Sequence, residues 1–221
     1  MVGGALHFTD RADGDFHIDG DPAALDARRR RMLDGPWTWL RQVHGAQVVV
    51  VDEPGQHAGA EADAVVTAHP DAVLAVHTAD CVPVLLVGMD ADVVGAAHVG
   101  WRGLVAGVLD ATADAMAGLG ARQVHAYVGP HIRARCYEFG ASELDQVASV
   151  CGDRVRATTA WGTPALDLLA GIQDTLARRG RGVLSVSPHA GCTACEPDRY
   201  FSHRARGDTG RHAAIIRRGS R

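Results

Sequence analysis

Three polar residues interrupt apolar stretches of the sequence and could together bind a metal ion. His44 stands just before the valine-rich run at 46–51, Cys81 separates two further apolar runs, and His98 lies near the end of another. One thiolate and two imidazoles form a ligand set that zinc favours, and three protein ligands leave the fourth position that catalytic sites keep open. Their separations of 37 and 17 residues match no local metal motif. A lone cysteine is commonly a small buried apolar residue, so spacing alone leaves both interpretations open.

Two further polar residues stand beside these candidates. Arg102 lies in V-G-W-R-G at 99–103, directly before a helical pattern, so backbone amides and a guanidinium are expected together at a helix N-terminus. Anions such as phosphate bind well there, although a surface arginine beside a helix cap is the alternative. Asp80 precedes Cys81 and could orient a ligand imidazole, act as an acid or base, or simply occupy a turn.

A second constellation near the C-terminus consists of His189, Cys192, Cys195 and His203. The two cysteines have the C-x-x-C spacing of closed zinc sites, but no second C-x-x-C is present. A structural zinc site is therefore one interpretation of this cluster. Cys136 and Cys151 have no obvious partners and are predicted to be core thiols.

The composition favours small-molecule chemistry. The 221 residues, 47% of them hydrophobic, can bury a core, and their length fits one domain spanning 1–221. A net charge of -4 and 5% aromatic residues provide neither a basic field nor a stacking platform for nucleic acid. Without a membrane-length apolar run or a signal peptide, the chain is predicted to be cytoplasmic, with no membrane partner and no disulfide framework.

Strands and helices alternate in the predicted structure. Valine-rich runs predict strands at 46–51, 64–67, 73–77, 82–87, 93–99, 123–128, 183–187 and 213–217. Helical patterns are predicted at 21–33 and 104–119, from Ser142 onward, and from Thr163-Pro164 to Gly180. Several neighbouring strands have no helix between them, so we expect a mixed-sheet α/β fold rather than a purely parallel one.

A series of short motifs runs through nearly the whole chain. They are Q-V-H-G at 42–45, E-A-D-A at 61–64, T-A-D-C-V-P-V at 78–84, A-H-V-G-W-R-G at 97–103, G-P-H-I at 129–132, C-Y-E at 136–138 and F-S at 201–202. In this order they resemble the YfiH family, also called the multicopper polyphenol oxidoreductase (laccase-like) family. The resemblance implies that His44, Cys81 and His98 bind zinc, and that the fold is an α/β sandwich related to bacterial cysteine-dependent toxin deamidases.

Two positions depart from the family's pattern. Val99 stands where the family has alanine, a change beside the proposed metal that should preserve ligation and narrow the pocket. The family's F-F-S-Y-R-R block reads Y-F-S-H-R-A at 200–205, so its second arginine is missing or displaced to Arg206. This block is therefore not assigned a substrate-binding role.

The resemblance implies a zinc-dependent purine nucleoside phosphorylase with adenosine deaminase side activity. Adenosine, inosine and methylthioadenosine are the candidate nucleosides, and the second substrate, phosphate, is expected near Arg102. Cys81 and Asp80 are also expected to take part in the reaction, with Asp80 or His77 as the proton carrier. A cysteine nucleophile is less favoured, because a thiolate bound to zinc cannot also attack freely.

Three other functions stay open at this point. The resemblance also permits an amidase that edits misincorporated residues in peptidoglycan precursors, because a zinc-activated water could attack an amide. A laccase-like polyphenol oxidoreductase is disfavoured, because a four-copper enzyme needs many histidines in H-x-H pairs and the sequence has none. A binding protein in which the three ligands only stabilise the fold is the non-catalytic alternative. The sequence makes no prediction of the oligomeric state.

Overall fold

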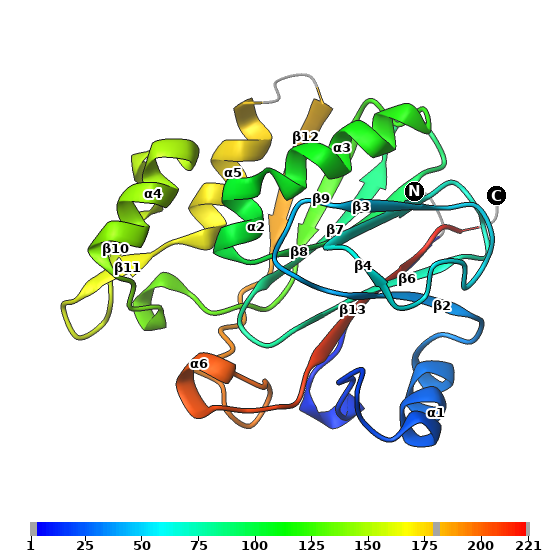
Figure 1. The fold of residues 1–221 in the computed structure, drawn as a ribbon, viewed down its shortest axis with the longest axis horizontal. Coiled ribbons are helices and arrows are strands. Elements are labelled where there is room, and N and C mark those ends of the chain that lie inside the picture. Colours follow the sequence, from blue (N-terminus) through cyan, green and yellow to red (C-terminus); the bar gives the residue numbers. More distant parts are fainter. Residues whose placement is uncertain (1–3, 179–181, 220–221) are drawn as a thin grey trace.

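Two β-sheets lie face to face in the computed structural model, which describes residues 4–178 and 182–219 (Figure 1). The five-stranded sheet has the order β1 (Ala5–Phe8), β13 (His212–Arg217), β6 (Val73–Thr78), β2 (Trp37–Arg41) and β4 (Ala60–Glu61). In this sheet β6 pairs antiparallel with β13 and parallel with β2. The sheet is therefore mixed, as the sequence predicted.

The second sheet has six strands, in the order β12 (Val183–Pro188), β9 (Val124–Val128), β7 (Val82–Gly88), β8 (Val94–Val99), β5 (Ala64–Thr67) and β3 (Val48–Val51). The central strand β7 pairs antiparallel with β8 and β9, whereas the outer pairs β3/β5 and β9/β12 are parallel. All residues of β5 and β8 are buried, which explains their nearly continuous apolar sequences.

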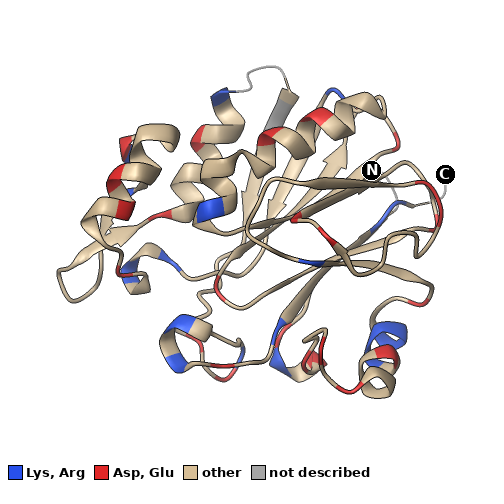
Figure 2. Cartoon of the chain, viewed as in Figure 1, with Lys and Arg blue, Asp and Glu red and all other residues tan. Residues whose placement is uncertain are grey.

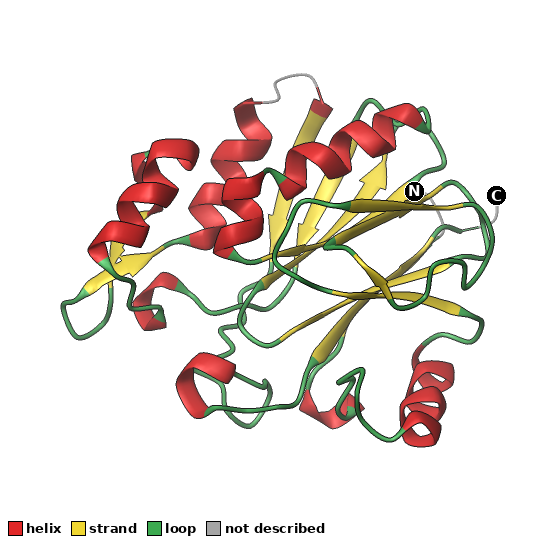
Figure 3. Ribbon diagram, viewed as in Figure 1, coloured by secondary structure: helices red, strands yellow, loops and turns green. Residues whose placement is uncertain are grey.

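Helices cover the outer faces of both sheets (Figure 3). On the six-stranded sheet lie α2 (Trp101–Ala106), α3 (Val108–Gly118) and α5 (Leu168–Arg178), and on the other sheet lies α1 (Pro22–Met32). α4 (Ala141–Cys151) packs against α2 and α5 at the side. Leu74, Leu85 and Ile216 belong to the apolar layer between the sheets. Each such side chain contributes about 1.5–3 kcal/mol when fully buried.

The helix predicted at 104–119 is two helices, and it begins earlier than predicted. α2 starts at Trp101 and ends where Gly107 adopts the left-handed conformation, with φ of 88°, before α3 begins at Val108. Glycine makes this conformation inexpensive, because it has no Cβ to clash with the following carbonyl oxygen. The break shortens the helix after His98 to six residues.

Other boundaries also differ from the sequence prediction. Thr163-Pro164 does not start a helix: Pro164–Leu166 is β11, which forms a hairpin with β10 (Arg156–Thr158). α5 begins at Leu168, where Asp167 Oδ1 accepts from the backbone N–H of Ala170 at 3.0 Å. Strands β1, β2 and β4 were also not predicted, and the predicted helix end at Gly180 lies outside the described residues. Within the described part of the chain, no helix is long and apolar enough to cross a membrane.

Candidate metal and substrate site

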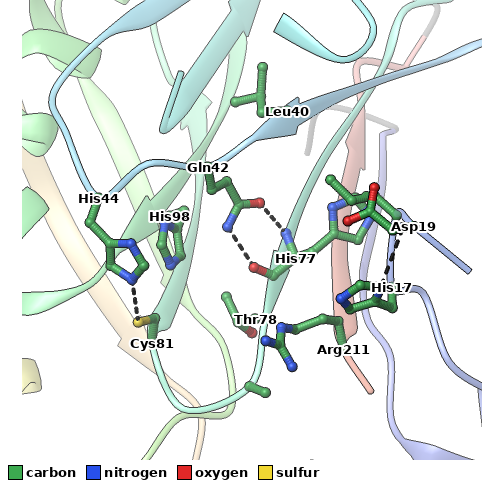
Figure 4. Close-up of a pocket in the computed structure, with 12 residues that line it drawn as sticks. His17, Asp19, Leu40, Gln42, His44, His77, Thr78, Cys81, His98 and Arg211 are labelled. Atoms are coloured by element: carbon green, nitrogen blue, oxygen red, sulfur yellow. Dashed lines mark hydrogen bonds between the residues drawn. The ribbon is translucent and has the colours of Figure 1, made fainter. Parts of the chain in front are cut away.

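The three predicted metal-ligating residues come from separate parts of the fold and meet at one point. His44 lies in the loop between β2 and β3, Cys81 in the turn that carries the chain from β6 in one sheet to β7 in the other, and His98 on β8. Their ligand atoms all lie within 4.8 Å of one another, and His44 Nε2 is 3.7 Å from Cys81 Sγ. Figure 4 shows the three side chains grouped at one end of the cavity. This group could hold a metal ion.

The carboxylate of Asp63 positions the two histidines. Asp63 directly precedes β5 and is fully buried. Its Oδ1 accepts from Nδ1 of His98 at 2.8 Å and from the backbone N–H of His44 at 3.0 Å. Its Oδ2 accepts from the backbone N–H groups of Val43 at 3.2 Å and Gly45 at 2.7 Å. Because an ionised carboxylate only accepts, Nδ1 of His98 carries the proton and Nε2 is left for a metal.

The backbone at this site is held in uncommon conformations. His44 has φ of 60° and Asp80 has φ of 101°, two of three positive values found for non-glycine residues in the described chain. Such conformations cost on the order of 1–3 kcal/mol each and persist where surrounding contacts enforce them. At His44, the enforcing contacts are the three backbone bonds to Asp63.

The carboxylate of Asp80 makes its hydrogen bonds to a different part of the site from the one expected. Its Oδ1 accepts from the hydroxyls of Thr193 and Ser202, both at 2.6 Å, and its Oδ2 accepts from the backbone N–H of Arg204 at 2.7 Å. These bonds fix the C-terminal segment to the turn that carries Cys81. The carboxylate that orients the His98 imidazole is that of Asp63, so the expectation that Asp80 orients an imidazole of this group is wrong.

The charges of the group are strongly coupled. Burial raises the pKa of Cys81, but the nearby His98 and His44 imidazoles outweigh it and lower this pKa to about 6. Burial lowers the pKa of His98, but the Cys81 thiolate and Asp63 outweigh it and raise this pKa to about 9. Burial likewise raises the pKa of Asp63, yet its bonds to His98 and the backbone hold it below the usual value. At neutral pH and without a metal, Cys81 is therefore a thiolate, the form that binds metals, and His98 is an imidazolium that gives up its Nε2 proton when a metal binds.

Gly100 and Gly103 have no side chains, and this leaves room for His44, Cys81 and the loop that carries His44. A Cβ on Gly100 would lie 2.7 Å from Cδ2 of His44 and 3.1 Å from Sγ of Cys81. A Cβ on Gly103 would lie 3.1 Å from the carbonyl oxygen of Gly45. The glycines of the G-W-R-G motif therefore let α2 pack directly against the loop that carries His44.

A cavity of about 230 Å³ opens on one side of the group (Figure 4). Besides His44, Cys81 and His98, its lining includes Gln42, His77, Thr78 and Arg211. The amide of Gln42 pairs with the backbone of His77 through bonds of 2.6 and 2.7 Å. Both ring nitrogens of His77 and the hydroxyl of Thr78 are buried without a hydrogen-bond partner in the protein. A polar ligand would satisfy them.

A second cavity, of about 180 Å³, lies on the other side of His44 and Cys81. Its lining includes Arg102 and Arg204, and the Arg102 guanidinium lies 4.4 Å from the centre of the Trp101 ring. Figure 2 shows basic residues on both α2 and α6 (His203–Arg206), the two short helices that border this cavity. The site therefore has two cavities that share His44 and Cys81 as a wall.

The two departures from the family pattern have little effect on these cavities. The side chain of Val99 packs in the core beneath the helices, so the expectation that it narrows the pocket is wrong. Arg206 donates to the backbone carbonyls of Thr193, Ala194 and Tyr200, which makes it part of the scaffold. The arginine of this block that lines a cavity is Arg204.

Comparison with known proteins gives consistent matches along the chain. Residues 4–219 match the family described as "Multi-copper polyphenol oxidoreductase laccase". A purine nucleoside phosphorylase of Streptomyces griseus is 42% identical over 97% of this chain and 95% of its own length. One of Mycobacterium tuberculosis is 42% identical over 90% of this chain and 82% of its own. The crystal structure of YlmD from Geobacillus stearothermophilus superposes with a TM-score of 0.84 at 28% identity, covering 99% of this chain and 93% of that one.

We expect Asp63→Asn to lower the free energy of unfolding of metal-free protein by about 3 kcal/mol, because it removes a buried charge that pairs with four donors. The lowered pKa of Asp63 adds stability above its unfolded value of about 4, and this is lost in acid. The raised pKa of His98 adds stability below about 6.5, and this is lost as the pH rises through about 9. The deficit of the variant should therefore be largest between about pH 4 and 6.5. Urea titrations at pH 3, 5.5 and 9 measure it, and a deficit that is independent of pH would contradict the assignment.

We expect Gly100→Ala to weaken binding of a divalent metal at least about tenfold, because the new methyl group displaces His44 and Cys81. Gly118→Ala in α3 is the matched control, since a Cβ there meets nothing within 4 Å. Competition with a chromophoric chelator measures both affinities. Equal affinities in the two variants would show that the close approach of Gly100 is not needed.

Proposed function

The chain belongs to the multi-copper polyphenol oxidoreductase laccase family, also called the YfiH family, and from this premise we propose that it is a zinc-dependent purine nucleoside phosphorylase. The observation that carries the proposal is the group of His44, Cys81 and His98, which stands between two polar cavities. A phosphorylase binds a nucleoside and phosphate next to each other, and two cavities that share His44 and Cys81 could hold one substrate each. The names of the relatives from Streptomyces and Mycobacterium support the same reaction.

Zinc fits the residues better than copper does. One thiolate and two imidazoles with an open fourth position suit catalytic zinc, whereas a copper site with these ligands adds a weak axial ligand, commonly methionine or glutamine. The methionines of the described chain line neither cavity, and the amide of Gln42 is already paired with the backbone of His77. A multi-copper oxidase also needs further histidine clusters, and the other metal-capable group among the described residues consists of cysteines. When bound, zinc would supply a Lewis acid at the shared wall.

We assign the nucleoside to the cavity beside His77. Burial lowers the pKa of His77 to about 3, so its ring is neutral at physiological pH, with one nitrogen donating and the other accepting. A purine edge offers the matching acceptor and donor groups. His77 would therefore hold the base by hydrogen bonds. It is poorly suited to be the proton carrier suggested by the sequence, because its imidazolium form is scarce at neutral pH.

We assign phosphate to the cavity beside Arg102 and Arg204. Guanidinium groups bind phosphate through paired N–H donors. In the reaction, an oxygen of hydrogen phosphate bonds to C1′ of the ribosyl group, the bond from C1′ to the purine nitrogen breaks, and the nitrogen takes up the proton that the phosphate loses. The products are ribose 1-phosphate and the free base. The phosphate charge stabilises the positive charge that develops on the ribosyl group.

Asp80 has a positioning role in this proposal. Its carboxylate holds Ser202, Thr193 and the backbone of Arg204, so it places the Arg204 side chain at the phosphate cavity. The adenosine deaminase side activity needs a proton carrier for the leaving ammonia. Neither Asp80, whose oxygens already accept three bonds, nor the neutral His77 suits that step. We therefore propose phosphorolysis as the main reaction.

The proposal is tested by incubating metal-quantified protein with adenosine or inosine, with and without phosphate, and separating the products by chromatography. We expect free base and ribose 1-phosphate only with phosphate, and Cys81→Ala to lose the activity together with the zinc held by His44, Cys81 and His98. Cys151→Ala, which alters a buried thiol on α4 remote from both cavities, is the control. Zinc-loaded protein that releases no base from either nucleoside would refute the proposal.

We expect Arg102→Gln and Arg204→Gln each to raise KM for phosphate about 10- to 100-fold, the effect of one lost charge-assisted hydrogen bond. KM for the nucleoside should stay unchanged, because the other cavity is intact. Arg199→Gln is the control, since Arg199 pairs with Glu196 at 3.1 Å and lines neither cavity. Steady-state kinetics with phosphate varied would measure the change. A rise in the nucleoside KM alone would reverse the assignment of the two cavities.

A further inference from the structure

A second group of metal-capable side chains lies outside this site. The Sγ atoms of Cys136, Cys192 and Cys195 all lie within 4.8 Å of one another, and those of Cys136 and Cys195 are 2.9 Å apart. Cys136 ends the short helix η2 (Ala134–Cys136), and the other two lie in the segment between β12 and α6. The topology thus brings together cysteines 59 residues apart in the sequence.

The composition of this group differs from the sequence prediction. Cys136 is half-buried and contacts Cys195, so the expectation that it is a core thiol without a partner is wrong, whereas Cys151 is buried as predicted. His189 Nδ1 accepts from the backbone N–H of Gly191 at 2.9 Å, and His203 lines the phosphate cavity. The metal-capable group therefore contains Cys136 in place of the two histidines.

The backbone around Cys192 is arranged to stabilise a thiolate. Its Sγ accepts from the backbone N–H of Arg133 at 3.5 Å, and the N–H groups of Ala194 and Cys195 also point to it. The turn is fixed by Glu196, whose Oε1 accepts from the N–H of Cys192 at 2.8 Å. Backbone N–H groups directed at the first sulfur of a C-x-x-C turn favour the charged form that binds a metal.

We propose that Cys136, Cys192 and Cys195 form a second metal site, which binds Zn²⁺ through three thiolates. Three thiolates this close would repel one another, and a divalent cation would remove that repulsion. Zinc–sulfur bonds of about 2.3 Å in a tetrahedron place sulfurs about 3.8 Å apart, so Cys136 and Cys195 need to separate by about 1 Å. If Cys136 and Cys195 formed a disulfide instead, the Cys192 thiolate, which the backbone N–H groups stabilise, would have no cation beside it. Cys195 is exposed, so solvent can supply water or a small anion as the fourth ligand.

The site would join the two segments that build one wall of the phosphate cavity. Cys136 precedes Tyr137, which lines that cavity, and the Arg204 guanidinium lies 5.2 Å from the centre of the Tyr137 ring. Cys192 precedes Thr193, whose hydroxyl bonds Asp80. A metal held between these segments would therefore stabilise the position of Arg204 from outside the first site.

The test is the zinc content of the full chain, purified under reducing conditions with Zn²⁺ and passed over a desalting column. We expect two zinc ions per chain in wild type, one in Cys195→Ser, one in Cys81→Ala and none in the double variant. Cys151→Ala should keep two. A single ion in wild type that is lost in Cys81→Ala and retained in Cys195→Ser would overturn the proposal.

A second measurement uses the wild-type chain alone, so its result does not depend on whether the variants fold. Alkylation followed by peptide mass spectrometry should show Cys136 and Cys195 protected when Zn²⁺ is bound and modified after treatment with a chelator. The same spectra detect a disulfide as a loss of two hydrogens between the two peptides. A disulfide that forms in the presence of Zn²⁺ and reductant would refute the site. So would an equal extent of alkylation of Cys136 and Cys195 with and without Zn²⁺.

Discussion

The buried carboxylate of Asp63 is the constraint on which the rest of the site depends. This side chain accepts four hydrogen bonds, three from the backbone at 43–45 and one from His98. It therefore links the loop that follows β2 of the five-stranded sheet to β8 of the six-stranded sheet. A charge buried this way is costly unless every donor is in place. The bonds therefore fix the positive φ of His44, the tautomer of His98 and the space between them.

The turn from β6 to β7 supplies the third part of this arrangement. The chain changes sheets there, so Cys81 lies between the sheet ends and faces both cavities. Asp80, in the same turn, ties down the segment that carries Arg204. The two carboxylates thus have different roles. Asp63 positions the group that could bind a metal, and Asp80 fixes the segment that forms a wall of the cavity assigned to phosphate. The proposed cysteine site supports that wall from the far side.

Much of this could be predicted from sequence, because the signals are local. Continuous valine runs predicted β5, β7 and β8. Polar residues that interrupt apolar runs made His44, Cys81 and His98 candidates, and the resemblance to the YfiH family favoured them as metal ligands. Asp63 belongs to the E-A-D-A motif at 61–64, but no role was predicted for it, because its partners lie 18 to 35 residues away and include backbone groups that sequence does not single out. Thr163-Pro164 has the composition of a helix start but pairs as a hairpin, since tertiary contacts override a short capping pattern. Cys136 likewise meets Cys195 only through the fold.

Anomalous diffraction at the zinc edge, from crystals of wild-type protein and Asp63→Asn, tests the central claim most directly. The account predicts a peak in wild type within about 2.0–2.3 Å of His44 Nε2, Cys81 Sγ and His98 Nε2. In Asp63→Asn, where the orientation of both histidines is lost, it predicts a weakened or displaced peak. Wild-type crystals with full zinc occupancy elsewhere and no peak at these three atoms would contradict it, as would an unchanged peak in the variant.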